Sequence, residues 1–158
     1  MPSDLSASAR RVQEALQRHG LDCHVVELPD STRTAPEAAA IGCHVAQIVK
    51  SLVFRGRCTD RPILVVASGA NRVNEKMLGE LAGEPVEKAS AGFVRERTGF
   101  AIGGVPPLGH IEPLLTFIDE DLLQYDEIWS AAGTPHAVFC LTPLQLTRIT
   151  GGIVTRIT

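Results

Sequence analysis

The sequence predicts an α+β fold in which a curved, mixed β-sheet is flanked by short helices. Apolar, β-branched runs and short amphipathic segments alternate along the chain, but without the regular period of a doubly wound sheet. Gly and Pro are frequent, with 14 and 10 residues, while aromatic residues make up only 4%, which indicates many turns around an aliphatic core. A length of 158 residues suits one core, so we expect a single domain over residues 1–158.

The helices are predicted from capping residues and apolar spacing. In the first, Ser3 or Asp4 is the N-cap, apolar residues recur every three or four positions, and Gly20 ends the helix. The acidic residues 119–121 are expected to start a helical segment, because negative charge is favourable at a helix N-terminus. The other helical segments are expected at residues 34–42 with a capping box, at 44–48, at 75–82 after Asn74, at 91–97 after Ser90, and from Thr142 and Pro143 onward.

The strands are predicted from β-branched, apolar runs that are bounded by turn residues. The seven runs lie at residues 24–28, 49–55, 62–67, 114–118, 127–131, 137–141 and 152–157. A short polar segment separates the second run from the third, which predicts a hairpin. The whole set, mixed with short helices, is what indicates a curved sheet of mixed direction.

The charge and the N-terminal residues limit the expected partners. A net charge of −3 at pH 7 disfavours a broad basic face that coats nucleic acid, so DNA is not an expected partner. The first residues lack the pattern of a secretory signal, and no stretch reaches the roughly 18 apolar residues of a membrane span. We therefore expect a cytoplasmic protein with no membrane partner.

Positive charge is concentrated in one part of the chain. Residues 50–76 contain six basic and two acidic residues, whereas the segments on both sides are net negative. This basic segment could contact a small anionic target. Taken alone, the charge pattern favours the alternative of an ordinary solvated hairpin.

Lys50 is the most informative single residue. In a strand over residues 49–55, the period of two places Lys50 on the same side as Leu52 and Phe54. The ammonium group then lies in line with an apolar stripe, as in a binding site. The alternative is that Lys50 begins the strand with its stem packed and its charged end in water. The pattern alone favours this alternative, because helix-to-strand junctions are usually exposed.

Two glycine-containing loops are further candidates. Five of the eight residues at 103–110 are Gly or Pro, so backbone N–H groups could approach a ligand oxyanion while the prolines stiffen the loop. The pattern matches neither G-x-G-x-x-G nor a P-loop, and it could be only a rigid turn. The second loop, residues 133–136, is a tight turn in which His136 either faces a ligand or is an ordinary surface histidine.

Cysteine and histidine pairs raise the alternative of a metal site. Cys23-His24 and Cys43-His44 are matching dipeptides, but adjacent residues of a strand point to opposite faces and cannot easily ligate one ion. Ser68 is not part of a G-x-S-x-G motif, which argues against a serine hydrolase. We therefore expect no metal and no cofactor, and a redox or zinc protein fits the spacing worst.

Several segments, taken together in chain order, carry a resemblance to a known family. They are residues 34–39, Gln-Ile-Val-Lys-Ser-Leu-Val-Phe at 47–54, Thr-Gly-Phe-Ala-Ile-Gly-Gly-Val-Pro-Pro-Leu-Gly at 98–109, and the turn at Gly133. This arrangement resembles the YbaK/ProX aminoacyl-tRNA deacylases, also called prolyl-tRNA synthetase-associated domains, over nearly the whole chain. The resemblance implies a trans-editing hydrolase that deacylates mischarged aminoacyl-tRNA, mostly tRNA for proline, at its 3′ acceptor end. Prolyl-tRNA synthetase is a further candidate partner.

The resemblance also implies roles for individual residues. Lys50 is the implied essential lysine, which holds the terminal adenosine and phosphate end of the substrate, and the backbone N–H groups of Gly103 and Gly104 face the scissile ester. An aminoacyl ester is already activated, so positioning and oxyanion stabilisation can suffice without a strong nucleophile. The implied substrate-binding residues are Val105, Pro106, Gly109, His110, Gly133, Thr134 and His136.

The expected substrate carries a small wrong amino acid such as alanine. Val105-Pro106-Pro107 and Thr134-Pro135-His136 depart from the cysteine-clearing pattern of the family, in which a serine precedes the loop proline and a Lys-Arg pair occupies the turn. The alternative function is a non-catalytic module that binds aminoacyl-tRNA or an aminoacyl-adenylate beside prolyl-tRNA synthetase. Retention of Lys50 and both loop glycines favours catalysis.

Overall fold

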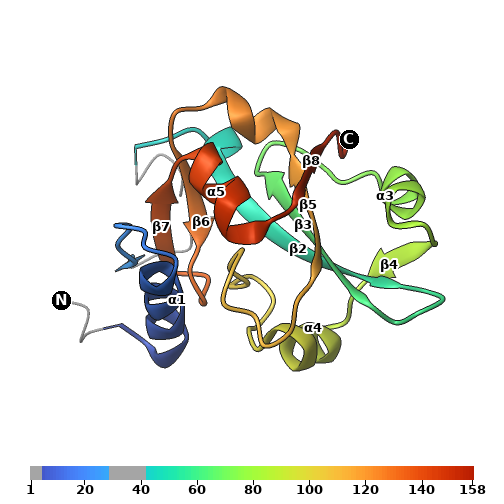
Figure 1. Ribbon diagram of the computed structural model, residues 1–158, viewed down its shortest axis with the longest axis horizontal. Helices are drawn as coiled ribbons and strands as arrows, with labels where there is room; N and C mark the ends of the chain where they lie inside the picture. Colours follow the sequence, from blue (N-terminus) through green and yellow to red (C-terminus); the bar gives the residue numbers. More distant parts are fainter. Residues whose placement is uncertain (1–4, 29–41) are drawn as a thin grey trace.

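The computed structural model describes residues 5–28 and 42–158, which form one eight-stranded mixed sheet with helices on both faces (Figure 1). The predicted α+β class is confirmed. The helices are α1 Ala7–Arg18, α3 Glu75–Ala82, α4 Ala91–Thr98 and α5 Pro143–Thr150, with short 3₁₀ turns η2 Val45–Gln47 and η3 Glu120–Gln124. The strands are β1 Val26–Glu27, β2 Ile48–Gly56, β3 Pro62–Ser68, β4 Val86–Lys88, β5 Leu115–Asp119, β6 Ile128–Ala131, β7 Ala137–Leu141 and β8 Ile153–Thr155.

The strand order along the sheet is β1-β7-β6-β2-β3-β5-β8, and β4 pairs with β2 outside this path. Strands β2 and β3 form the predicted antiparallel hairpin, in register from Val49 opposite Ser68 to Arg55 opposite Pro62. On its other side, β2 pairs with β6 at residues 48–49 and with β4 at residues 54–56. In the described sheet, residues 50–53 of β2 therefore have a strand partner on one side only.

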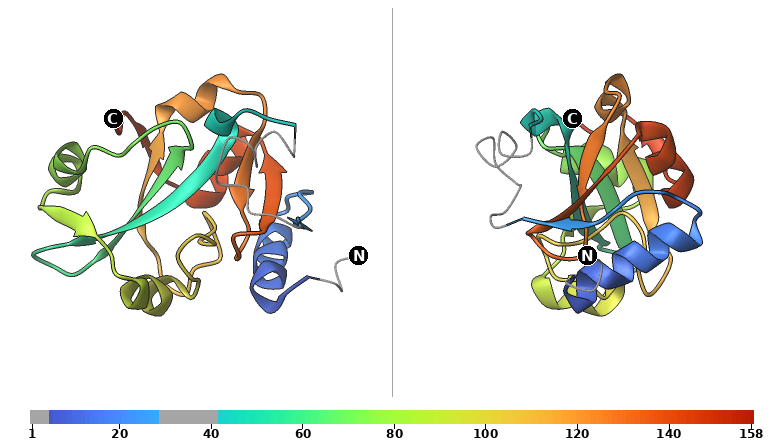
Figure 2. Two further views of the ribbon diagram at one scale, coloured as in Figure 1. Left: turned by 180° about the vertical axis from the view of Figure 1, so that it is seen from behind. Right: turned by 90° about the vertical axis from the view of Figure 1, so that its left-hand side faces the viewer.

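The sheet separates two apolar clusters. The larger contains residues of α1 and α5 and includes Val49 and Val53, while the smaller contains residues of α3 and includes Phe54. Helix α5 lies in front of the strands in Figure 1 and behind them in the reversed view of Figure 2. The alternation along β2 confirms the predicted period of two.

Among residues 5–28 and 42–158, none of the helices combines the length and the hydropathy that crossing a lipid bilayer requires.

Helix α1 begins later than predicted. Ser6 is its N-cap, because the Ser6 hydroxyl accepts a hydrogen bond from the Ala9 N–H at 3.3 Å. The expectation of a cap at Ser3 or Asp4 is therefore wrong. A cap at Ser3 or Asp4 would place Leu5 inside the helix, but Leu5 precedes it and is buried in the larger cluster.

Strand β1 is shorter than the predicted run 24–28, and Gln13 of α1 explains why. The Gln13 side chain donates to the Cys23 carbonyl at 3.0 Å and accepts from the Val25 N–H at 2.8 Å. These backbone groups are satisfied by a helix side chain rather than by a neighbouring strand. Only Val26 and Glu27 then pair with β7.

The other predicted elements lie near their expected positions. Asn74, Ser90 and Thr142 are confirmed as N-caps, and Asp119 caps η3. Strand β4 was not predicted, because two of its three residues are charged. The predicted last strand, 152–157, is shorter, and the predicted helix at 34–42 falls almost entirely on residues 29–41, outside the described part.

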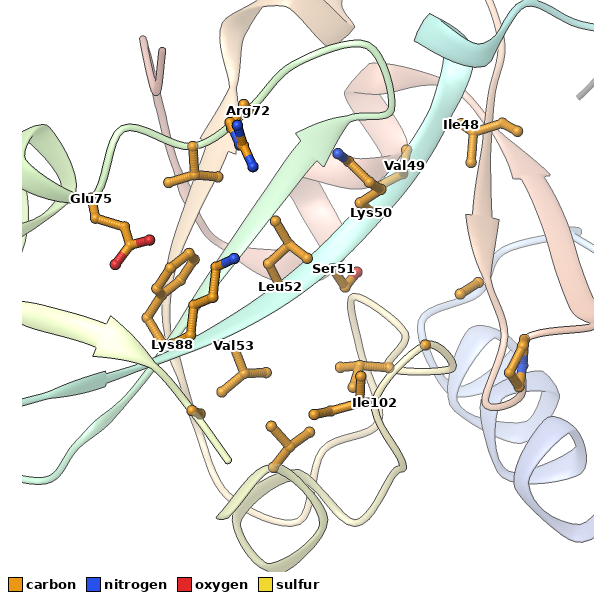
Figure 3. Close-up of a pocket in the computed structure, with 18 residues that line it drawn as sticks. Ile48, Val49, Lys50, Ser51, Leu52, Val53, Arg72, Glu75, Lys88 and Ile102 are labelled. Atoms are coloured by element: carbon orange, nitrogen blue, oxygen red, sulfur yellow. The ribbon is translucent and has the colours of Figure 1, made fainter. Parts of the chain in front are cut away.

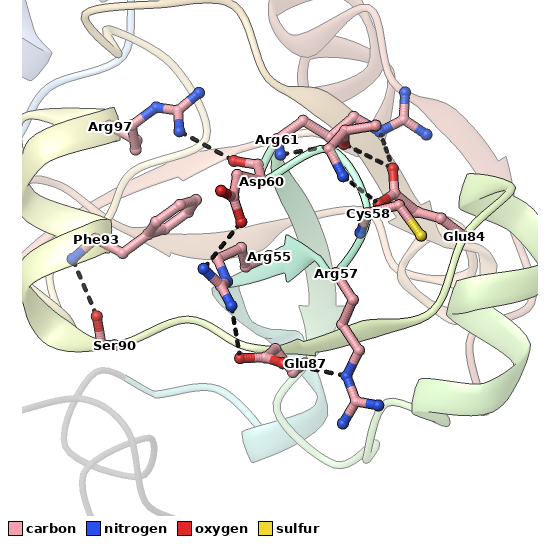
Figure 4. A network of polar contacts seen from close by, with 11 residues as sticks. Arg55, Arg57, Cys58, Asp60, Arg61, Glu84, Glu87, Ser90, Phe93 and Arg97 are labelled. Atoms are coloured by element: carbon pink, nitrogen blue, oxygen red, sulfur yellow. Dashed lines mark hydrogen bonds and ion pairs between the residues drawn. The ribbon is translucent and has the colours of Figure 1, made fainter.

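The tip of the β2–β3 hairpin carries a network of ion pairs (Figure 4). Arg55 pairs with Asp60 at 2.9 Å and with Glu87 at 3.3 Å, and Arg57 pairs with Glu87 at 3.1 Å. Arg61 pairs with Glu84 at 3.2 Å. Three of the six basic residues of segment 50–76 are thus paired with acids, so the hairpin tip matches the solvated-hairpin alternative.

Replacing Gln13 by alanine should destabilise the protein, because Gln13 is only 7% exposed and its two backbone partners would lose their hydrogen bonds. We expect a loss of about 2 kcal/mol in the free energy of unfolding. Urea denaturation measures it. Gln17→Ala, an exposed position of the same helix, is the control and should change stability by less than about 0.5 kcal/mol. Equal stability of the two variants would contradict this account of β1.

Candidate functional site

A cavity of about 630 Å³ lies against β2, where the strand lacks a second partner (Figure 3). It extends around the open edge of the strand, so side chains of both faces contribute to its wall. Its size is that of a small-molecule site. The lining residues are Ile48–Phe54 of β2, Arg72, Val73 and Glu75 after β3, Lys88 and Ala89 at the end of β4, Val94 of α4, Ile102, Gly103 and Val105 of the Gly-Pro loop, and Ala131 and Pro135 near the β6–β7 turn.

Lys50 lies in the wall of this cavity and is half-buried. Its Nζ donates a hydrogen bond to the Asn71 carbonyl at 3.0 Å. Burial lowers the pKa of Lys50, the positive charge of Arg72 lowers it further, and the negative charge of Asp119 opposes both. Figure 3 draws Lys50 and Arg72 at the same end of the cavity. Lys50 thus lines the cavity with its ammonium bonded to the backbone, and its role in a site stays a prediction.

Ser51 is a second polar residue of the cavity, and the sequence did not single it out. Its Oγ is buried and has no hydrogen-bond partner among the described residues. The Val53 carbonyl accepts from the Ala89 N–H at 3.2 Å on the open side of β2. Because backbone groups alternate along a strand, the N–H and C=O of Ser51 point to the same open side. Ser51 therefore offers polar groups where the sheet is interrupted.

The Gly-Pro loop is fixed against the β6–β7 turn and α1 by close backbone contacts. A Cβ on Gly104 would lie 2.7 Å from the Thr134 Cα and 2.8 Å from the Gly133 carbonyl oxygen. The Gly133 N–H donates to the Gly104 carbonyl at 2.9 Å, and a Cβ on Gly133 would lie 2.6 Å from the Ser8 carbonyl oxygen. Only glycine fits at either position. The loop wall of the cavity is therefore rigidly supported from behind.

The structure brings together only part of the predicted site. Lys50, Gly103 and Val105 line the cavity, whereas Gly104 lies behind it, and its N–H is already bonded to the Ala101 carbonyl at 3.0 Å. Gly133 and Thr134 are also not among the residues that line the cavity. The Thr134 hydroxyl instead accepts from the backbone N–H groups of the β6–β7 turn.

The two candidate histidines are not among the residues that line the cavity. His110 lines a different cavity, of about 320 Å³, together with Gly109. The Nε2 of His110 lies 2.7 Å from the carbonyl oxygen of the buried Pro106, and burial lowers the His110 pKa. His136 is exposed, which matches the surface alternative.

Residues that the sequence reasoning missed complete the cavity. Arg72 follows β3, Lys88 ends β4, and Ile102 precedes the paired glycines. Lys88 could not be found because β4 was not predicted. Within residues 5–28 and 42–158, no three His, Cys, Asp or Glu side chains are grouped as metal ligands would be.

A family model described as an aminoacyl-tRNA editing domain matches residues 29–149. The chain belongs to this family. The matched region contains Lys50, the Gly-Pro loop and the β6–β7 turn, so the resemblance seen in the sequence is confirmed at the level of the family. Editing of aminoacyl-tRNA is the function for which the family is named.

Individual relatives and solved structures are similar to the chain over most of its length. The chain is 34% identical to "Uncharacterized protein YwhH" of Bacillus subtilis, over 77% of this chain and 78% of that protein. It is 30% identical to "Putative Cys-tRNA(Pro)/Cys-tRNA(Cys) deacylase EbsC" of Enterococcus faecalis, over 72% and 74%. A solved structure described as "a putative trans-editing enzyme for prolyl tRNA synthetase" is 52% identical, with a TM-score of 0.92 over 98% of this chain and 99% of that one. The structure of "hypothetical protein APE2540" is 32% identical, with a TM-score of 0.84 over 93% and 98%.

The partly buried His110 should make the editing domain less stable in mild acid. Its pKa is lowered in the folded state, while an unfolded histidine titrates near pH 6.5, so below about pH 6.5 the unfolded state binds more protons. The free energy of unfolding should therefore have its full value above that pH range, and it should decrease as the pH is lowered from 7.5 to 5.5. His110→Gln, which keeps a donor for the Pro106 carbonyl, should weaken this dependence in urea titrations. His24→Gln, at an exposed position, should not; equal effects of the two substitutions would refute the assignment.

Proposed function

We propose that the protein is a trans-editing hydrolase that deacylates mischarged tRNA for proline carrying a small wrong amino acid such as alanine. The observation that carries this proposal is the half-buried Lys50 ammonium in the wall of a cavity that residues of the Gly-Pro loop also line. The editing family supplies the reaction class, and the relatives named for trans-editing and deacylation support it.

Hydrolysis of the aminoacyl ester requires attack of water on the carbonyl carbon. The carbonyl oxygen then becomes an oxyanion, and the ester bond to the ribose oxygen breaks as that oxygen takes up a proton. In this proposal Lys50 holds the terminal adenosine and phosphate end of the tRNA, with Arg72 at the same end of the cavity. The N–H of Gly103 faces the ester carbonyl, where a backbone donor lowers the energy of the oxyanion.

The amino-acid side chain would occupy the apolar part of the cavity. Val53, Val94 and Val105 line this part, and their β-branched side chains have few rotamers, so the space is fixed in shape. Such a wall favours a small apolar side chain. A synthetase pocket discriminates poorly against smaller side chains, which is the physical reason that a second site is needed.

A panel of charged tRNAs tests the proposal. tRNA for proline carrying Ala, Cys, Ser, Thr or 2-aminobutyrate is incubated with the protein, and the loss of the aminoacyl ester is followed over time. We expect turnover of alanyl-tRNA and no turnover of prolyl-tRNA. Binding of these tRNAs without hydrolysis of any would instead support the non-catalytic module, and selective loss of cysteine would reassign the substrate.

Removal of the Lys50 charge should abolish turnover. Lys50→Met keeps the apolar stem and removes the ammonium, so we expect at least a hundredfold lower kcat/KM. The melting temperature should not fall, because a half-buried charge is removed together with its desolvation cost. Lys76→Met, at an exposed position outside the cavity, is the matched control. Near-native rates in Lys50→Met would refute the role of this lysine.

Ser51→Ala should separate stability from activity. The buried hydroxyl has no partner among the described residues, so its loss should leave the free energy of unfolding unchanged or raise it by about 1 kcal/mol. If the hydroxyl binds the substrate, kcat/KM should nevertheless fall about tenfold. Unchanged kinetics would make Ser51 a passive part of the cavity wall.

A further inference from the structure

Two residues outside the cavity lining, Asn71 and Asp119, are connected to the Lys50 ammonium by successive hydrogen bonds. The Lys50 Nζ donates to the Asn71 carbonyl at 3.0 Å. The Asn71 side-chain amide donates to the Asp119 carboxylate at 2.8 Å. Neither residue was a candidate in the sequence, because the connection depends on three separate segments meeting.

Asp119 holds the turn that follows β3. Strands β3 and β5 are parallel neighbours, so both end at the same edge of the sheet, where Asp119 ends β5. Its Oδ2 accepts from the Ser68 N–H at 3.0 Å and from the Asn71 amide, and its Oδ1 accepts from the Asp121 N–H at 3.0 Å. One carboxylate therefore fixes both the end of β3 and the start of η3.

The burial of Asp119 indicates that this carboxylate has a specific purpose. Asp119 is only 1% exposed, and no ion pair involving it is formed within the described residues. Burying a charge is costly unless donors surround it, and the three N–H donors named above meet that need. Asp121 also accepts from the Asn71 amide, at 2.7 Å, which fixes both amide hydrogens.

We propose that Asp119 and Asn71 are positioning residues that hold the Lys50 ammonium in the direction it needs to meet the substrate. The inference rests on the proposed function, in which Lys50 contacts the tRNA end. Asp119 fixes the Asn71 side chain, the Asn71 carbonyl then binds one N–H of Lys50, and the two other N–H groups stay directed to the cavity. Neither positioning residue touches the substrate.

The negative charge of Asp119 also acts on Lys50 through space. Asp119 on β5 raises the pKa of Lys50, while Arg72 on the turn after β3 lowers it. Among the described residues, Glu75 and Lys88 are the other charged side chains that line the cavity. An uncharged residue at position 119 should therefore let the Lys50 pKa fall further below its usual value.

Titration of the lysine side chains tests this directly. The chain has only three lysines, Lys50, Lys76 and Lys88, so ¹³C NMR of the Cε groups resolves each one, with Lys76→Arg and Lys88→Arg giving the assignment. In Asp119→Asn, the Lys50 titration midpoint is expected to move to lower pH by roughly 0.5 unit or more. Glu120→Gln removes the same charge from the adjacent, exposed position and should move it far less.

Kinetics provide a second measurement. In Asp119→Asn, the alkaline limb of the pH profile of kcat/KM should move to lower pH with the Lys50 midpoint. Asn71→Ala keeps the backbone carbonyl and all charges, so it should lower kcat about tenfold without moving that limb. If Asp119→Asn does not fold, Asn71→Ala alone decides, since an unchanged kcat would overturn the proposal.

The outcomes distinguish this inference from the proposed function. An unchanged Lys50 midpoint in Asp119→Asn, or a shift no larger than that in Glu120→Gln, overturns the positioning role even if the wild-type protein is an active deacylase. If Asp119→Asn loses activity while the alkaline limb of its kcat/KM profile stays at the same pH, Asp119 has only a structural role. A wild-type protein that hydrolyses no charged tRNA contradicts the proposed function, and the NMR titration still decides whether Asp119 sets the state of Lys50.

Discussion

The candidate site exists because β2 is paired unequally on its two sides. Strand β3 pairs with it along nearly its whole length, whereas β6 reaches only residues 48–49 and β4 only residues 54–56. A continuous neighbour on that side would occupy the space of the cavity. The interruption exposes backbone groups and side chains of both sheet faces to one space, which a fully paired strand cannot do. The hairpin with β3 supports the interrupted strand along its other edge, from Val49 to Arg55.

The opposite wall depends on close packing of main chain against main chain. Gly104 lies against the β6–β7 turn, and Gly133 lies against α1, at separations that leave no space for a Cβ. Three segments distant in sequence are thereby fixed relative to one another. The side of the cavity formed by Gly103 and Val105 is consequently as well defined as the strand that it faces.

Local features were predictable from the sequence, and long-range features were not. The β2–β3 hairpin, the caps at Asn74, Ser90 and Thr142, and the side of β2 that carries Lys50 follow from spacing and residue type alone. Strand β1 was overestimated because the bonds from Gln13 connect two segments. His110 was grouped with the loop that contains it, although the chain turns there and buries it on another side. Asp119 carried only a capping signal, since its relation to Lys50 arises from the parallel pairing of β3 and β5.

The ion pairs at the hairpin tip have a consequence for how a negatively charged protein could bind an RNA end. Because Arg55, Arg57 and Arg61 are already paired with carboxylates, the basic groups that residues 5–28 and 42–158 place at the cavity are Lys50, Arg72 and Lys88. Three phosphate contacts with a single strand would release about two counterions. The affinity for a charged tRNA would then fall only about as the second power of the salt concentration. In the proposed function, an editing domain with so few free basic groups would hold the charged end of its substrate with modest affinity.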